Sequence, residues 1–126
     1  MNKPSYFEIQ ADNTKRAVSF YGEIFGWRFE EVKGLPVEYW RETSGAMVAV
    51  LKRPAKTPPR ECGTNAFVCS MEVANFDTVA LKITNHDGQI ALPKFAVPGR
   101  CWQGYFIDTE GNTFGIFQVD EKAKSM

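Results

Sequence analysis

The 126-residue chain carries 15 Lys and Arg residues against 15 Asp and Glu residues, together with one histidine and three cysteines. This length corresponds to about one domain, and the hydrophobic share of 44% and charged share of 24% are those of a globular protein. Zero net charge argues against a nucleic-acid partner, and a single histidine excludes a His-rich metal centre. Three cysteines without a CxxC pair argue against a zinc framework or a disulfide scaffold. Because no stretch of 18 apolar residues or signal-peptide core occurs, we expect a cytoplasmic protein that does not contact a membrane.

The first half of the chain predicts a strand, a helix and three further strands. Alternating polarity over 6–11 predicts a strand. Apolar residues at helical spacing predict a helix over 15–25, after the cap candidates Asp12, Asn13 and Thr14 and before Gly26. The further strands are predicted over 27–32, 37–41 and 46–51, the last two joined by a turn at 42–45. Residues 52–63 contain three prolines and four Lys or Arg residues, which is typical of a linker.

The second half predicts the same order of elements. The expected elements are a strand over 66–73, a helix capped by Asn75 or Asp77 and running to about 85, strands over 89–92, 102–108 and 113–119, and a frayed polar tail over 120–126. An offset of 62 aligns Tyr6 with Val68, and an offset of 66 aligns Gly45 with Gly111. Each half is therefore a βαβββ module, and we predict one α+β domain over 1–126, built by duplication from modules at about 5–53 and 64–119.

Two stretches of the sequence resemble the vicinal oxygen chelate superfamily, the glyoxalase and bleomycin-resistance group. The first runs from Phe7 to Asn13 and continues through Phe20-Tyr21 to Phe25-Gly26-Trp27. The second is Gly104 to Gly115, which is similar to the family's Asp-Pro-x-Gly-Asn turn with Thr109 in place of proline. The resemblance covers about 5–119 and implies a glyoxalase-like fold, in which the two modules form a paired mixed sheet around a cleft. It implies no particular reaction, because the superfamily includes lyases, epimerases, dioxygenases, thiol transferases and drug-binding proteins.

The resemblance also implies four positions for the ligands of a divalent metal. They fall on Tyr6, Ala49, Val68 and Gly115 in this sequence. Only Tyr6 has a side chain that could ligate a metal, whereas a site of this kind needs at least three good donors. We therefore predict that the protein uses no metal cofactor.

Strand parity predicts which side chains share the cleft with those four positions. It adds Glu8 and Gln10 in the first module and Ser70 and Glu72 in the second. Pairing Arg41 with Ala46 across the first hairpin, and the matching pairing in the second module, complete the set. The predicted ligand-binding residues are Tyr6, Gln10, Glu38, Trp40, Met47, Ala49, Val68, Ser70, Trp102, Phe106, Gly115 and Phe117, with Gly104 and Thr113 on the same face.

Glu8 and Glu72 are the candidate catalytic residues, because a carboxylate on a concave sheet face can act as a general acid or base. Alternatively, each is solvated or paired with an arginine such as Arg28, Arg41 or Arg100. Trp40 and Trp102 either stack a planar ligand or fill the barrel interior. His86 is expected in a solvated turn, and Cys69 is expected to be an inert thiol facing the helix layer.

Together these patterns predict a metal-independent protein that binds a small organic ligand, planar or partly aromatic, in the cleft between its modules. The alternative is a lyase or isomerase of the glyoxalase type that uses Glu8 or Glu72 as its base. A third hypothesis is a vestigial cleft in a protein whose role is dimerisation. The sequence favours binding over catalysis, and the expected partners are a small molecule and a second copy of the chain.

Overall fold

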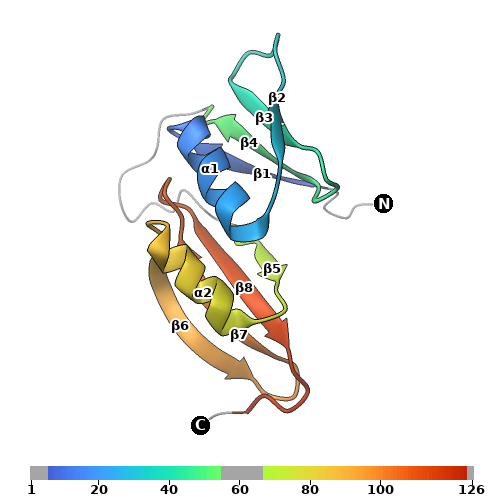
Figure 1. The fold of residues 1–126 in the computed structure, drawn as a ribbon, viewed down its shortest axis with the longest axis vertical. Coiled ribbons are helices and arrows are strands. Elements are labelled where there is room, and N and C mark those ends of the chain that lie inside the picture. Colours follow the sequence, from blue (N-terminus) through green and yellow to red (C-terminus); the bar gives the residue numbers. More distant parts are fainter. Residues whose placement is uncertain (1–5, 55–66, 125–126) are drawn as a thin grey trace. The chain divides into compact units, whose positions relative to one another are not determined.

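The computed structural model describes residues 6–54 and 67–124. The chain divides into two compact units, Met1–Thr64 and Asn65–Met126 (Figure 1). The first unit contains β1 (Phe7–Ala11), α1 (Thr14–Phe25), β2 (Phe29–Glu31), β3 (Tyr39–Glu42) and β4 (Val48–Lys52). The second contains β5 (Ser70–Glu72), α2 (Phe76–Asn85), β6 (Gln89–Val97), β7 (Cys101–Ile107) and β8 (Thr113–Val119). Both units have the order βαβββ, which confirms the predicted α+β fold of two modules.

The first unit is a four-stranded mixed sheet with the order β1-β4-β3-β2. Strand β1 runs parallel to β4, and the remaining pairs are antiparallel. Helix α1 contacts β1, β3 and β4, so it covers one face of the sheet (Figure 1). Its buried residues Ala17, Phe20, Tyr21 and Ile24 lie on one stripe of the helix, as the sequence spacing predicts. This stripe supplies the helical side of the core.

The second unit repeats this plan with the order β5-β8-β7-β6. Helix α2 contacts β6, β7 and β8. Phe76 and Ile83 are its buried residues, and the Phe76 ring lies 6.2 Å from that of Phe106. Strand β5 pairs in parallel with β8, while β6, β7 and β8 form antiparallel pairs.

Equivalent asparagines begin the two helices. The Asn13 side chain accepts a hydrogen bond from the backbone N–H of Arg16 at 3.0 Å, and the Asn75 side chain accepts one from Thr78 at 2.9 Å. Each bond satisfies an N–H group that has no partner within the helix. Helix α1 ends at Gly26, whose positive φ of 71° suits a residue without a Cβ.

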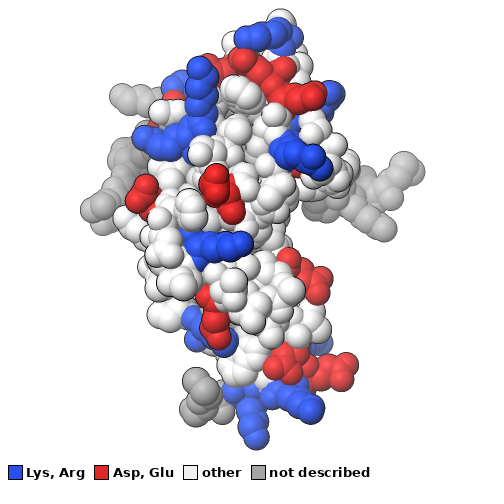
Figure 2. Space-filling view, viewed as in Figure 1, with Lys and Arg blue, Asp and Glu red and all other residues white. Residues whose placement is uncertain are grey.

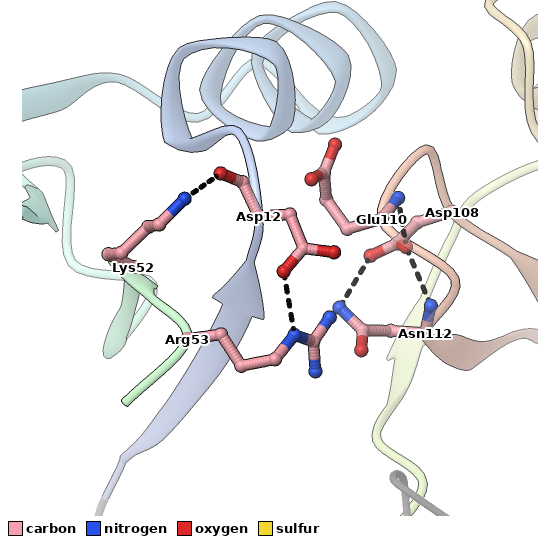
Figure 3. Close-up of polar contacts among 6 residues, drawn as sticks. All are labelled: Asp12, Lys52, Arg53, Asp108, Glu110 and Asn112. Carbon is pink, nitrogen blue, oxygen red and sulfur yellow. Dashed lines mark hydrogen bonds and ion pairs between the residues drawn. The ribbon is translucent and has the colours of Figure 1, made fainter. Parts of the chain in front are cut away.

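Equivalent acids hold the loops between the last two strands of each unit. In the first unit, one oxygen of Glu42 accepts the N–H groups of Ser44 at 2.7 Å and Ala46 at 3.0 Å. In the second unit, one oxygen of Asp108 accepts the N–H groups of Glu110 and Asn112, each at 2.8 Å (Figure 3). The acid thus binds the second and fourth residues after itself in both modules, which makes the two loops conformationally similar.

A charged pair also fixes the ends of two neighbouring strands in the first unit. The Arg53 side chain donates to the Asp12 carboxylate at 3.1 Å, and Lys52 donates to the Asp12 backbone carbonyl (Figure 3). The backbone N–H of Arg53 donates a hydrogen bond to the Ala11 carbonyl at 3.0 Å. These contacts join the end of β1 to the end of β4.

Three regions differ from the sequence prediction. Strand β5 comprises only Ser70–Glu72, whereas a strand was expected over 66–73. Strand β6 continues to Val97 rather than ending at Leu92, because register shifts on either side of Leu92 let the edge strand pass through Pro93. The tail after β8 is not frayed as far as Ala123, which is 2% exposed and accepts the Gly99 N–H at 2.9 Å. Most of the predicted linker, with Cys62, lies outside the described residues.

Candidate functional site: the helix-free sheet faces

Each sheet has one face covered by its helix and one face that the helix does not cover, called here the helix-free face. Residues paired across neighbouring strands point to the same face, so the register assigns every side chain. In the first unit, Glu8 pairs with Ala49, and Ala49 with Arg41. The next row joins Gln10, Leu51 and Tyr39. These rows lie on the helix-free face, as predicted for Glu8, Gln10 and Ala49.

Trp40 and Glu38 lie on the other face, which corrects their predicted position. Trp40 pairs with Val50, and its indole Nε1 donates to the Thr14 hydroxyl at the start of α1 at 3.2 Å. The same hydroxyl donates to the Glu38 carboxylate. Both side chains therefore serve the junction between helix and sheet.

The second unit shows the same division. Ser70 pairs with Gly115, and Gly115 with Tyr105. The neighbouring row joins Glu72, Phe117 and Gln103. The predicted placement of Ser70, Glu72, Gly115 and Phe117 on one face agrees with this register, and Thr113 shares their strand parity.

Trp102 and Phe106, with Gly104, lie on the helix-covered face, contrary to prediction. Trp102 pairs with Gln118, whose side chain accepts the N–H of Phe76 in α2 at 2.7 Å. Phe106 is 2% exposed and lies in the core beside Phe76. Of the alternatives for the two tryptophans, the structure supports a packing role.

Both errors have one cause, which is the loop held by the turn acid. Arg41 pairs with Ala49 rather than Ala46, and Ile107 pairs with Thr113 rather than Asn112. A register shift by an odd number of residues moves a whole strand's side chains to the opposite face. The residues missed in this way are Tyr39, Arg41, Gln103 and Tyr105. The asparagine and glycine that follow Asp108 are the sequence signal that favours a loop longer than a tight turn.

On the first unit's helix-free face, Tyr6 and Glu8 form a polar pair. The Tyr6 hydroxyl donates to the Glu8 carboxylate at 2.7 Å. This hydrogen bond, followed by one with Tyr39, raises the pKa of Tyr6 to about 12. The phenol therefore stays protonated at neutral pH and acts as a donor. The side chains at the centre of this face are buried, since Ala49 is 1% exposed and Leu51 is 8% exposed.

The second unit's helix-free face is aromatic and only half-buried. Phe117, Tyr105 and Phe95 are all of intermediate exposure, and the rings of Phe95 and Tyr105 stack at 6.2 Å with an interplanar angle of 29°. Phe95 joins this face because it pairs with Gln103. Aromatic rings with a few fixed polar groups are the usual surroundings of a small organic ligand.

Gly115 lies where the resemblance places a metal-binding glutamate. A Cβ at this position would stand 2.2 Å from the Ser70 hydroxyl, 2.8 Å from Gln103 Nε2 and 3.1 Å from the Tyr105 ring. The space is filled because Gln103 donates to Ser70 at 3.1 Å. A side chain at position 115 would therefore displace this hydrogen bond.

The residues present do not fit the family metal. Tyr6 donates its proton to Glu8, Ala49 and Val68 have no donor atoms, and Gly115 has no side chain. Within residues 6–54 and 67–124, no group of three or more His, Cys, Asp or Glu side chains could hold a metal ion. The donor set that the fold family uses is thus not reproduced at the four positions.

Two predicted site residues lie beside strands rather than within them. Met47 is 59% exposed and precedes β4 with a positive φ of 58°. Val68 is 47% exposed and precedes β5. Neither is placed on a sheet face by the strand register.

Neither Glu8 nor Glu72 forms an ion pair with an arginine among the described residues. His86 is exposed at the end of α2, where Nδ1 lies 2.8 Å from the Lys82 carbonyl. Burial raises the pKa of the half-buried Cys69 thiol, which disfavours the nucleophilic thiolate. Acidic and basic side chains are interspersed on the visible face of each unit (Figure 2).

No helix in the described part of the chain is long and apolar enough to cross a membrane.

The fold and the family comparison agree. The family model of the Glyoxalase/Bleomycin resistance protein/Dioxygenase superfamily matches residues 3–116. The chain therefore belongs to this superfamily. No curated protein sequence matches it.

Solved structures share the fold at low sequence identity. A glyoxalase/bleomycin resistance protein/dioxygenase domain from Frankia sp. EAN1pec is 13% identical with a TM-score of 0.75, over 96% of this chain and 94% of that one. A family enzyme from Burkholderia phytofirmans PsJN is 17% identical with a TM-score of 0.72, over 92% and 98%. A point mutant of the fosfomycin resistance protein FosX from Listeria monocytogenes, complexed with Mn(II) and 1S,2S-dihydroxypropylphosphonic acid, is 11% identical with a TM-score of 0.71, over 95% and 94%.

Proposed function

We propose that this protein binds a small planar organic ligand, without a divalent metal, on the helix-free face of its second sheet. The observation that carries the proposal is the filled space at Gly115, where the Ser70–Gln103 hydrogen bond occupies the place of a metal-binding side chain. Beside it, Phe117, Tyr105 and Phe95 offer half-buried ring faces. Offset stacking on such rings stabilises planar molecules.

The contrast with FosX supports the metal-independent part. That relative is complexed with Mn(II) in one solved structure. In this chain, the corresponding family positions provide one protonated phenol, two aliphatic side chains and a glycine. We therefore expect this protein to retain the family fold and to bind its ligand through aromatic rings, amide groups and hydroxyl groups.

Metal binding is tested on the purified protein. After incubation with Mn²⁺, Ni²⁺ or Zn²⁺ and gel filtration, elemental analysis is expected to find far less than one ion per chain. Stoichiometric retention of one of these ions, with a matching rise in Tm, would refute metal independence.

Ligand binding is tested by titrating ¹⁵N-labelled protein with naphthalene-based fragments. We expect amide shifts at Ser70, Gln103 and Phe117, and loss of these shifts in Phe117→Ala. Leu81→Ala is the matched control, because Leu81 is an apolar residue 62% exposed on α2 of the same unit. Equal loss in both variants, or shifts confined to other segments, would contradict the proposed site.

The enzymatic alternative has one observation in its favour. The Tyr6 hydroxyl holds the exposed Glu8 carboxylate in a fixed position, which a general base requires. If a lyase or isomerase activity is found, Glu8→Gln is expected to lower kcat strongly, while Tyr6→Phe lowers it less. An unchanged rate in Glu8→Gln removes Glu8 as the base.

Homodimerisation stays a prediction, which sedimentation equilibrium would test.

A further inference from the structure

Two polar side chains on the second unit's helix-free face, Gln103 and Glu72, keep acceptor atoms without a partner among the described residues. Gln103 Nε2 donates to Ser70 at 3.1 Å and to the Gly104 carbonyl at 3.4 Å. Its amide oxygen accepts no hydrogen bond from a described residue. The exposed Glu72 carboxylate likewise has no hydrogen bond or ion pair within the described part of the chain. Two open acceptors favour a ligand with hydrogen-bond donors, and the carboxylate among them favours a positively charged donor.

These two acceptors flank an aromatic ring. Glu72, Phe117 and Gln103 lie in one row across β5, β8 and β7. Since neighbouring strands are about 4.8 Å apart, the backbones of Glu72 and Gln103 are separated by about 10 Å. A single positively charged group above Phe117 can therefore approach both acceptors and the negative face of the ring.

No basic side chain of the strands competes for this position. Lys94 is the only Lys or Arg residue within β5, β6, β7 and β8. Its Nζ lies 3.2 Å from the Asp77 carboxylate of α2 and 4.8 Å from the Trp102 ring on the helix-covered side. The strands therefore carry a carboxylate on the helix-free face, while their one cation is engaged on the opposite face.

We propose that this face selects organic cations: planar or aromatic ligands that carry a protonated amine, amidine or guanidine group. The cation lies above Phe117 between Glu72 and the Gln103 amide oxygen, and the ring system stacks on Tyr105 and Phe95. This inference rests on the proposed ligand-binding function and adds the charge class of the ligand to it.

The test uses three probes that share one ring system and differ in charge: 2-naphthylmethylammonium, 2-naphthylmethanol and 2-naphthoate. Dissociation constants are measured by NMR titration of the full-length protein at pH 7. The ammonium is expected to bind about 5–10-fold more tightly than the alcohol, and the carboxylate most weakly. Raising the NaCl concentration from about 50 mM to about 500 mM should weaken only the ammonium substantially, because salt screens exposed charges.

The Glu72→Gln variant is expected to lose the preference for the ammonium while keeping its affinity for the alcohol. Glu72 is exposed, so the variant should fold, as its amide spectrum will show. Glu121→Gln is the matched control, because it removes one exposed carboxylate of the same unit outside this face.

The outcomes separate the two proposals. Equal affinity of the wild-type protein for the ammonium and the alcohol, or an unchanged preference in Glu72→Gln, overturns the charge assignment and leaves the ligand face in place. If none of the three probes shifts the amides of this face, the proposed function fails with it.

Discussion

The two units fill the same helix–sheet junction with opposite distributions of volume. Thr14 and Phe76 are the first residues of α1 and α2, and Trp40 and Gly104 lie opposite them on β3 and β7. In the first unit the small helical residue receives the large indole of the sheet, through a hydrogen bond of 3.2 Å. In the second, the large helical ring lies over a glycine, and a Cβ on Gly104 would stand 2.6 Å from it. In both units the space between helix and sheet is filled. The bulky side chain comes from the sheet in the first unit and from the helix in the second.

The largest effect expected from this difference is at Phe76. Phe76 is 2% exposed, so Phe76→Ala should lower the free energy of unfolding by about 3–5 kcal/mol through lost burial and a cavity. The equivalent Thr14→Ala removes a hydroxyl and should cost about 1–2 kcal/mol. Urea unfolding followed by circular dichroism measures both. Equal costs would mean that the two junctions are not organised as described.

Gly104→Ala provides the control for this comparison. Alone, it overpacks the junction against Phe76 and should cost about 1–3 kcal/mol. In the Phe76→Ala background the added methyl group enters the vacated space, so its cost should fall to near zero. If the two losses of unfolding free energy are additive, the cost of Gly104→Ala does not arise from contact with the Phe76 ring.

The turn acids permit a second comparison, in which pH is the variable. Burial alone would raise the pKa of Glu42, but hydrogen bonds from the Ser44 hydroxyl and from the N–H groups of Ala46, Arg28 and Ser44 outweigh it and lower the pKa from 4.5 to about 2. The folded state therefore binds the Glu42 proton less readily than the unfolded state. The resulting stability is fully present above about pH 4.5 and is lost as the pH falls towards 2.

Glu42→Gln should remove this component. At pH 7 the variant is expected to be less stable by about 1–3 kcal/mol, because the hydrogen bonds that the charged carboxylate accepts from backbone N–H groups are weakened. Its unfolding free energy should also change less than that of the wild type between pH 4.5 and 2. Parallel pH profiles for the two proteins would contradict the assignment.

The smallest expected difference is between the two helix caps. Asn13 and Asn75 make equivalent hydrogen bonds, at 3.0 and 2.9 Å. Asn13→Ala and Asn75→Ala should each cost about 1 kcal/mol. Replacement of either by Asp, which can accept the same bond, should restore most of the loss. A cost in one module alone would show that the duplication does not extend to the energetics of its caps.

Local patterns in the sequence predicted the fold because they depend on neighbouring residues. The structure selects Asn13 among the three cap candidates 12–14, and it agrees with the predicted helix stop at Gly26 and the strand over 113–119. The order of elements then led to the correct family. Pro93 hid the second half of β6, since its ring normally ends a strand, and only the two register shifts around it permit continuation.

The sequence predicted the side chains of the candidate face correctly only on the strands of the two parallel pairs, β1–β4 and β5–β8. Alternation within β1 and β5 placed Glu8, Ser70 and Glu72 on this face, and Phe117 came from the hairpin pairing of the second module. The faces of β3 and β7 depend on the length of the acid-held loops, and one residue in such a loop reverses every side chain that follows. The prediction therefore placed Trp40 and Trp102 on the helix-free face, where the structure has their neighbours Arg41 and Gln103.

Strand β6 has a consequence for the behaviour of the protein at high concentration. It is the edge of its sheet, and nine residues with exposed Ile90 and Leu92 would otherwise present a continuous template for another strand. Pro93 has no backbone N–H donor, and the two register shifts break the regular spacing of the strand. The irregularities therefore act as protection against open-ended strand addition, so that straightening β6 by replacing Pro93 would be expected to favour aggregation before it altered the fold.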